Sequence, residues 1–227
     1  MQYQTATRIG TIATEQNKVL RNTYMMLALT MIPTMIGAFI GTSMNFSFMA
    51  ASPIISSLLM FGAMIGMMFA VSALRNSVWG IAALLGFTFV AGVFLGPILQ
   101  VALHFKNGAQ LIGMAAGGTG IIFFSLATIA TVTKKDFSFM GKFLFIGLIL
   151  LIVASLANMF FQIPALSLTI SAIGVLIFSA YILYDVSRIV NGGETNYVMA
   201  TLGLFLSIYN LFISLLQLLM AFSGERD

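Results

Sequence analysis

The sequence has no cysteine, one histidine and very little charge. Without cysteine, disulfides, thiol catalysis and cysteine metal sites are excluded. The histidine, His104, has no Glu or second His beside it at metal-ligand spacing, so we expect neither a metal nor a cofactor. Only 7% of the 227 residues are charged and 60% are hydrophobic, a balance that a water-soluble domain with a polar surface does not reach. The composition predicts an integral membrane protein.

Long apolar runs occupy most of the chain. A helix that crosses a bilayer needs about 20 predominantly apolar residues, and seven runs reach this length. The runs are continuous rather than alternating, which excludes the period-two pattern of a membrane β-barrel. We therefore predict an all-α integral membrane protein, a seven-transmembrane helical bundle. The predicted spans are residues 24–43, 53–73, 78–101, 110–132, 142–162, 165–188 and 198–222.

The basic residues predict how the chain is oriented. Residues 1–23 form a polar N-terminal tail, residues 24–222 the membrane domain, and residues 223–227 a short C-terminal tail. Lys and Arg divide eight to two between the two sides, and the side richer in them is normally cytoplasmic. We expect a cytoplasmic N-terminus and an external C-terminus. The eight are Arg8, Lys18, Arg21, Arg75, Lys134, Lys135, Lys142 and Arg188, and the two are Lys106 and Arg226.

The same basic residues are scattered among short loops and form no patch. We therefore expect the lipid bilayer, and not nucleic acid, as a partner.

Pro33 and Pro97 lie inside predicted spans and are expected to kink them. Small residues spaced four apart favour close helix packing, either within the chain or at a homodimer face. These pairs are Gly37 and Gly41, Gly62 and Gly66, Gly92 and Gly96, and Gly113 and Gly117.

Polar and small residues form a stripe on each of the last two spans. On the sixth, steps of three and four keep Ser167, Ser171, Gly174, Phe178, Tyr181 and Asp185 on one helix side. On the seventh, the same holds for Gly203, Ser207, Asn210, Ser214 and Gln217. Lipid offers no hydrogen-bond partner, so these stripes should face protein or trapped water, and we expect the seventh helix to be central. Two readings remain open: hydrogen bonds that hold the helices in register, or a water-lined path or proton-sensitive latch.

Asp185 is the candidate functional residue within a span. An ionisable side chain inside the membrane is a functional-site hypothesis by default. Against this, Asp185 lies only about one turn from the cytoplasmic end, where Arg188 at i+3 is a candidate partner for a purely structural pair. A second intramembrane aspartate, as an aspartyl protease requires, is absent, and no nucleophile and base stand together. We predict that the protein is not an enzyme.

Several segments resemble the Bax inhibitor-1 family, and specifically its bacterial YccA-like branch. They occur in order over nearly the whole chain: NKVLRNTY at 17–24, FLGPIL at 94–99, TKKDFSFMG at 133–141, ANMFFQIPAL at 157–166, ILYDVSRIVNGGETNY at 182–197 and LFLSIYNLFISLLQLL at 204–219. The resemblance implies seven helices, with the last surrounded by the other six. For the YccA-like branch it implies a bacterial inner-membrane protein that binds and modulates FtsH, a membrane-anchored ATP-dependent protease.

The resemblance also implies an alternative function, a pH-sensitive cation leak that passes calcium or protons. In leak-forming members, two aspartates on the last two helices form a pH-sensitive pair near the cytoplasmic face. Asp185 matches the first position, but the second falls on Ser207, so the pair is broken here. Modulation of FtsH is therefore the leading expectation. The functional candidates are Asp185, Arg188, Ser207, Asn210, Ser214 and Gln217.

Overall fold

The computed structural model describes residues 2–47 and 51–224, and within them the chain is helical with no strand. Seven helical segments are long and apolar enough to cross a membrane, as the composition predicted. Their ends lie within a few residues of the predicted ends, except that the first starts eight residues earlier. They are Gln16–Ser43, Pro53–Leu74, Val78–Leu103, Gly108–Thr133, Ser138–Phe161, Pro164–Val190 and Tyr197–Ser223.

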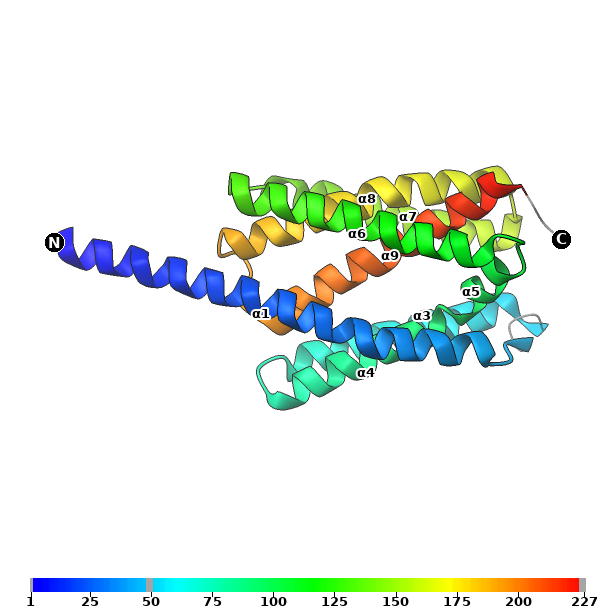
Figure 1. The fold of residues 1–227 in the computed structure, drawn as a ribbon, viewed down its shortest axis with the longest axis horizontal. Coiled ribbons are helices and arrows are strands. Elements are labelled where there is room, and N and C mark those ends of the chain that lie inside the picture. Colours follow the sequence, from blue (N-terminus) through cyan, green and yellow to red (C-terminus); the bar gives the residue numbers. More distant parts are fainter. Residues whose placement is uncertain (1, 48–50, 225–227) are drawn as a thin grey trace.

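Short loops connect these spans into a bundle of antiparallel neighbours (Figure 1). The helices are α1 (Gln2–Ser43), α3 (Pro53–Leu74), α4 (Val78–Phe94), α5 (Gly96–Leu103), α6 (Gly108–Thr133), α7 (Gly141–Phe161), α8 (Pro164–Val190) and α9 (Tyr197–Ser223). A single 3₁₀ turn, Ser138–Met140, precedes α7, and α4 and α5 together make the third span.

The four prolines have two different effects. Pro53, Pro97 and Pro164 each lie in the first turn of a helix, where the missing N–H costs nothing. At Pro97 this start interrupts the third span, because α4 ends at Phe94 and α5 begins at Gly96, as predicted. Pro33 instead lies inside α1, which continues through it to Ser43.

Helix α1 begins well before the membrane span. The segment expected to be a polar tail is helical from Gln2 and runs without a break into the span, which starts at Gln16. Once the span is helical, no new nucleation is needed, because each further residue that joins the helix adds one hydrogen bond. Polar residues before the span can therefore extend the same helix. The change from polar to apolar residues therefore coincides with the start of the apolar span and not with the start of the helix. Figure 1 shows this N-terminal arm projecting beyond the bundle. Arg226 of the expected C-terminal tail lies outside the described residues.

The last helix, α9, occupies the centre of the bundle. It contacts α1, α3, α4, α5, α6 and α8. Its side chains Leu204, Phe205 and Leu211 are fully buried in the main apolar core, together with Phe87 of α4 and Ile182 of α8. The centrality predicted from the polar stripe is confirmed.

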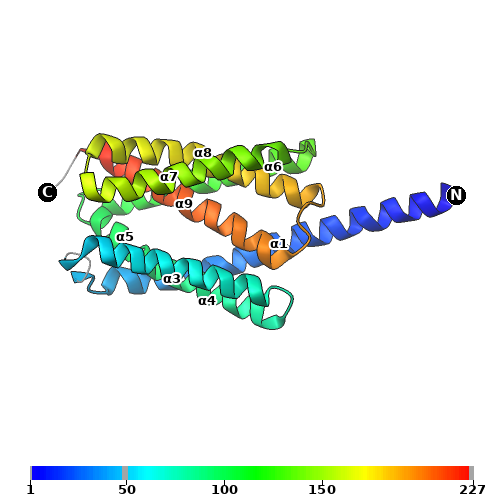
Figure 2. The same cartoon turned by 180° about the vertical axis from the view of Figure 1, so that it is seen from behind.

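Helix α7 departs from the arrangement that the family resemblance implied. It packs against α8 through a separate apolar cluster of Leu144, Leu151 and Ile177, and lies alongside α8 at one side of the bundle (Figure 2). The enclosure of α9 is therefore made chiefly by the other spans, and α7 covers the outer side of α8.

Two of the four glycine pairs bring helix backbones together. A Cβ at Gly37 would collide with the Phe89 carbonyl of α4, and one at Gly92 with the Thr34 carbonyl of α1. Their partners Gly41 and Gly96 face each other just beyond this crossing, where α5 begins. The α1–α4 crossing is the most extensive helix contact of the bundle. The close packing expected of these pairs is confirmed. At the other four glycines, a Cβ would meet nothing within 4 Å: Gly62, Gly66, Gly113 and Gly117.

Candidate functional site

The polar stripes of α8 and α9 face each other across an antiparallel helix pair. At one end, the Ser171 hydroxyl donates to Gln217 Oε1 over 2.7 Å. In the middle, a Cβ built at Gly174 would lie 2.6 Å from Ser214 Oγ, so the absence of a side chain at Gly174 makes room for the Ser214 hydroxyl. Ser171 and Ser214 are buried. The structure therefore brings together most of the residues that the sequence pattern placed on these faces.

Asp185 and Ser207 meet at the other end of the stripes. The Ser207 hydroxyl lies 3.2 Å from Asp185 Oδ2 and 3.1 Å from the carbonyl oxygen of Gly203. A hydroxyl carries one proton, so it donates to only one of these acceptors at a time. An ionised Asp185 accepts this proton, whereas a protonated Asp185 donates to Ser207 and leaves the serine proton for the Gly203 carbonyl. The contact therefore has two hydrogen-bonded states that differ in the charge of Asp185.

Asn210 does not hydrogen-bond across the helix pair. Its amide donates to the Leu206 carbonyl of its own helix over 2.8 Å, an i to i−4 bond. Asn210 therefore adds no hydrogen bond to the α8–α9 seam, the line along which the two polar stripes meet.

Arg188 does not pair with Asp185, contrary to the structural pair considered from the sequence. Its guanidinium Nη2 donates to the Gly193 carbonyl over 3.0 Å and lies 3.8 Å from Glu194 Oε2. It also lies over the Tyr184 ring, 5.6 Å from the centroid. The turn at Gly192, where φ is 77°, folds the chain back so that Gly193 and Glu194 reach this side chain. Arg188 thus holds the α8–α9 loop, and Asp185 hydrogen-bonds with Ser207 instead.

A second set of polar contacts, which the sequence analysis missed, ties three loops together at this end of the bundle. Ser187, fully buried, donates to the Lys135 carbonyl over 3.0 Å and accepts from the Phe137 amide over 2.9 Å. The α6–α7 loop is thereby fixed to α8. No periodic signal marks Ser187, because its two partners lie about 50 positions earlier in the chain.

Asn196 makes the corresponding connection for α9. Its side-chain oxygen accepts from the amides of Val198 and Met199, each over 3.0 Å, and caps α9. Its amide group donates to the Arg75 carbonyl over 3.2 Å and to Asn76 Oδ1 over 2.9 Å in the α3–α4 loop. An Asn directly before an apolar run is a recognisable helix start, so the cap was readable from the sequence.

These contacts gather the basic loops at one end of the bundle. The α3–α4, α6–α7 and α8–α9 loops meet there, and Gln16 of α1 lies against Gly192. The opposite end carries the loop with Lys106, where the Ser223 hydroxyl donates to Asn107 Oδ1 over 3.2 Å. Within the described part of the chain, no three His, Asp or Glu side chains come together as metal ligands.

Comparison with known proteins identifies relatives along almost the whole chain. The family model described as "Inhibitor of apoptosis-promoting Bax1" matches residues 16–224. A protein of Escherichia coli K12 named "Modulator of FtsH protease YccA" is 42% identical over 203 residues, which cover 89% of this chain and 90% of that protein. An "Uncharacterized membrane protein" of Vibrio cholerae is 41% identical and covers 90% of each chain. The chain, a multi-pass seven-helix membrane protein, therefore belongs to the Bax inhibitor-1 family and to its bacterial YccA-like branch.

Proposed function

We propose that this protein is a bacterial inner-membrane regulator that binds FtsH, the membrane-anchored ATP-dependent protease, and modulates its activity. The observation that carries the proposal is the 42% identity, over 89% of the chain, with the E. coli protein named as a modulator of that protease. A second E. coli relative with the same identity is named an inner membrane protein.

The orientation that fits this role has the basic end of the bundle in the cytoplasm. That end carries the α3–α4 and α6–α7 loops with Arg75, Lys134 and Lys135, and the positive-inside rule favours it as cytoplasmic. Residues 2–15 of the α1 arm then extend beyond the membrane as about 21 Å of helix at 1.5 Å per residue. The other cytoplasmic loops are short and tied to one another. The arm is therefore the segment that an ATP-driven protease on this side would engage first.

Asp185 and Ser207 form the regulatory contact in this proposal. A change in the charge of Asp185 changes which acceptor the Ser207 hydroxyl uses, and this contact lies beside the loops at the basic end. Arg188 supports it by holding the α8–α9 loop, and Ser214 and Gln217 by holding the register of the two helices, whereas Asn210 bonds only within α9.

The test is reconstitution of the purified protein with FtsH in nanodiscs or liposomes. We expect the two proteins to co-isolate, and the degradation of a membrane-embedded FtsH substrate to slow as this protein is added. The E. coli relative serves as the positive control, and an unrelated seven-helix protein as the negative control. The proposal fails if the positive control co-isolates and this protein does not.

The second candidate function is a cation leak along the α8–α9 seam. The observation in its favour is the polar seam itself, which ends at Asp185. Calcium binds to several oxygen ligands, often carboxylates, and the described residues bring no acidic cluster to this seam. Liposomes loaded with a calcium or pH indicator test it: ion entry that depends on Asp185 supports the leak, and tight liposomes refute it.

A further inference from the structure

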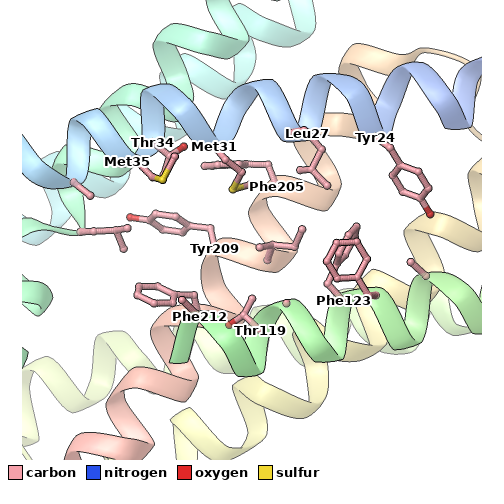
Figure 3. A pocket seen from close by; sticks show the side chains of 18 of the residues that line it. Tyr24, Leu27, Met31, Thr34, Met35, Thr119, Phe123, Phe205, Tyr209 and Phe212 are labelled. Atoms are coloured by element: carbon pink, nitrogen blue, oxygen red, sulfur yellow. The ribbon is translucent and has the colours of Figure 1, made fainter. Parts of the chain in front are cut away.

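An apolar cavity of about 990 Å³ lies between α1 and α6, with α9 behind it (Figure 3). Phe205, Tyr209 and Phe212 of α9 line it. At about 100° per residue, this aromatic face points away from the polar stripe that carries Ser207 and Ser214. The cavity and the α8–α9 seam are therefore separate features on opposite sides of the central helix.

The cavity opens sideways to the surroundings of the bundle. Three of its lining residues are largely exposed: Met35 of α1 at 63%, and Phe124 and Val132 of α6 at 69% and 74%. All three lie within membrane spans. The medium at this opening is therefore lipid, and an apolar molecule can enter from the bilayer without crossing water.

The polar groups of the lining are almost all satisfied within the protein. The threonine hydroxyls each donate to the carbonyl four residues earlier, and the Tyr209 hydroxyl donates to the Ala91 carbonyl over 3.0 Å. These threonines are Thr34, Thr119, Thr128 and Thr131. No charged side chain lines the cavity. A hydrated ion would find no ligands here, so the cavity suits an apolar occupant.

The exception is the hydroxyl of Tyr24. Its oxygen is buried and has no hydrogen-bond partner among the described residues. The ring extends from α1 toward α6 and makes an edge contact with Phe123, at 6.1 Å between centroids (Figure 3). Thr131 is the nearby hydroxyl on α6: it donates its own proton to the Ala127 carbonyl, and its oxygen lies near the Tyr24 hydroxyl without a well-formed hydrogen bond between them. A buried donor without a well-formed hydrogen bond is costly, and a ligand oxygen that met this hydroxyl after a turn of the Tyr24 side chain would remove the cost.

Positive charge surrounds the Tyr24 end of the cavity. Arg21, one turn before Tyr24 on α1, is exposed. Lys134 and Lys135 directly follow the last turn of α6 and are also exposed. Asp136 offsets one of these charges, which leaves a net positive rim. Such a rim attracts the headgroups of anionic lipids.

Shape and charge distinguish between two apolar occupants. A partner transmembrane helix is a rigid cylinder about 10 Å in diameter. A flexible acyl chain has no such minimum width and can follow the space between α1 and α6, and the anionic headgroup attached to it complements the positive rim.

We propose that this cavity binds an acyl chain of an anionic glycerophospholipid, whose ester or phosphate oxygen accepts a hydrogen bond from Tyr24. Arg21, Lys134 and Lys135 flank its headgroup. The bound chain occupies the space between α1 and α6 and packs on the aromatic face of α9.

The experiment uses phosphatidylglycerol with a photoreactive diazirine on an acyl chain, in nanodiscs that contain the full-length protein. Gly120→Leu is the blocking variant, because Gly120 lines the cavity and a Cβ there meets nothing within 4 Å. Gly117→Leu is the matched control on the same helix: its Cβ is equally free, but it is not a lining residue. Tyr24→Phe removes only the unpartnered hydroxyl.

We expect labelling of the wild type on α1, α6 and α9 lining residues, unchanged labelling with Gly117→Leu, and its loss with Gly120→Leu. Tyr24→Phe should weaken apparent affinity about fivefold, the factor that one ordinary hydrogen bond is worth. Gel filtration and thermal unfolding check that each variant is folded. If Gly120→Leu does not fold, labelling of Tyr24→Phe decides the test. Labelling unaffected by both variants would overturn the site. A co-purified protein segment in the cavity, or equal labelling by a phosphatidylcholine probe, would overturn the anionic lipid as occupant.

Discussion

Gly92→Ala should destabilise the bundle, whereas Gly62→Ala should not. Alanine in place of helical glycine ordinarily stabilises by about 0.5–1 kcal/mol. At Gly62 nothing lies within 4 Å of the added Cβ, so this gain should be seen. At Gly92 the Cβ would collide with the Thr34 carbonyl, and a backbone atom cannot rotate away as a side chain can. Overpacking of this kind costs about 1–3 kcal/mol, and because the helix-propensity gain is common to both variants, we expect them to differ by about 1–3 kcal/mol.

The assay is reversible unfolding of both variants in mixed micelles, monitored by circular dichroism at increasing mole fraction of a denaturing detergent. Gly113→Ala on α6 is a second control, because its Cβ also meets nothing within 4 Å. The α1–α4 crossing is the most extensive helix contact in the bundle, so a change there should lower the free energy of unfolding of the whole protein. Equal stability of Gly92→Ala and Gly62→Ala would refute the close approach of α1 and α4.

Four further predictions concern regulation and orientation. Asp185→Asn should retain the fold, because Asp185 has no ion pair to Arg188 to lose, while altering the effect on FtsH in the reconstituted assay; a collapse in thermal stability would instead make the residue structural. Ser207→Asp should create two adjoining carboxylates that share a proton, so a pH-dependent conformational or leak signal should appear in liposomes, and a flat pH profile would contradict the geometry. Removing about half of the arm formed by residues 2–15 should lengthen the half-life of the protein in cells with active FtsH without loss of co-isolation; equal half-lives would rule out the arm as a handle. In the cysteine-free background an impermeant reagent added outside should label single cysteines at Asn107 and Ser223 but not at Thr5, and the reverse pattern would invert the topology.

The number and position of the helices could be predicted from the sequence because the bilayer is a demanding solvent. A chain in lipid must satisfy its backbone internally, so a long apolar run becomes a helix of readable length. The facing of the two polar stripes also followed from the sequence, since the steps of three and four put Asp185 and Ser207 on inward faces that lipid cannot satisfy. The same reasoning placed α9 at the centre.

The partners of most other side chains were decided by the tertiary structure. Arg188 was three residues from Asp185, but the turn at Gly192 brought Glu194 to it instead. Ser187 found its partners in a loop about 50 positions earlier. These contacts depend on which chain segments meet at the basic end, and no local pattern encodes that.

The tertiary structure also separates residues that the sequence pattern does not distinguish. Gly92 and Gly62 belong to pairs with identical spacing, yet only Gly92 lies against another backbone. The apolar residues that line the cavity between α1 and α6 have the same character as those of the core. Lipid tails solvate an apolar side chain about as well as protein does, so hydrophobicity in a membrane span does not distinguish an interior face from a lipid-facing one. Only the packing of the helices decided which faces are closed, which are open, and where Tyr24 was left without an acceptor.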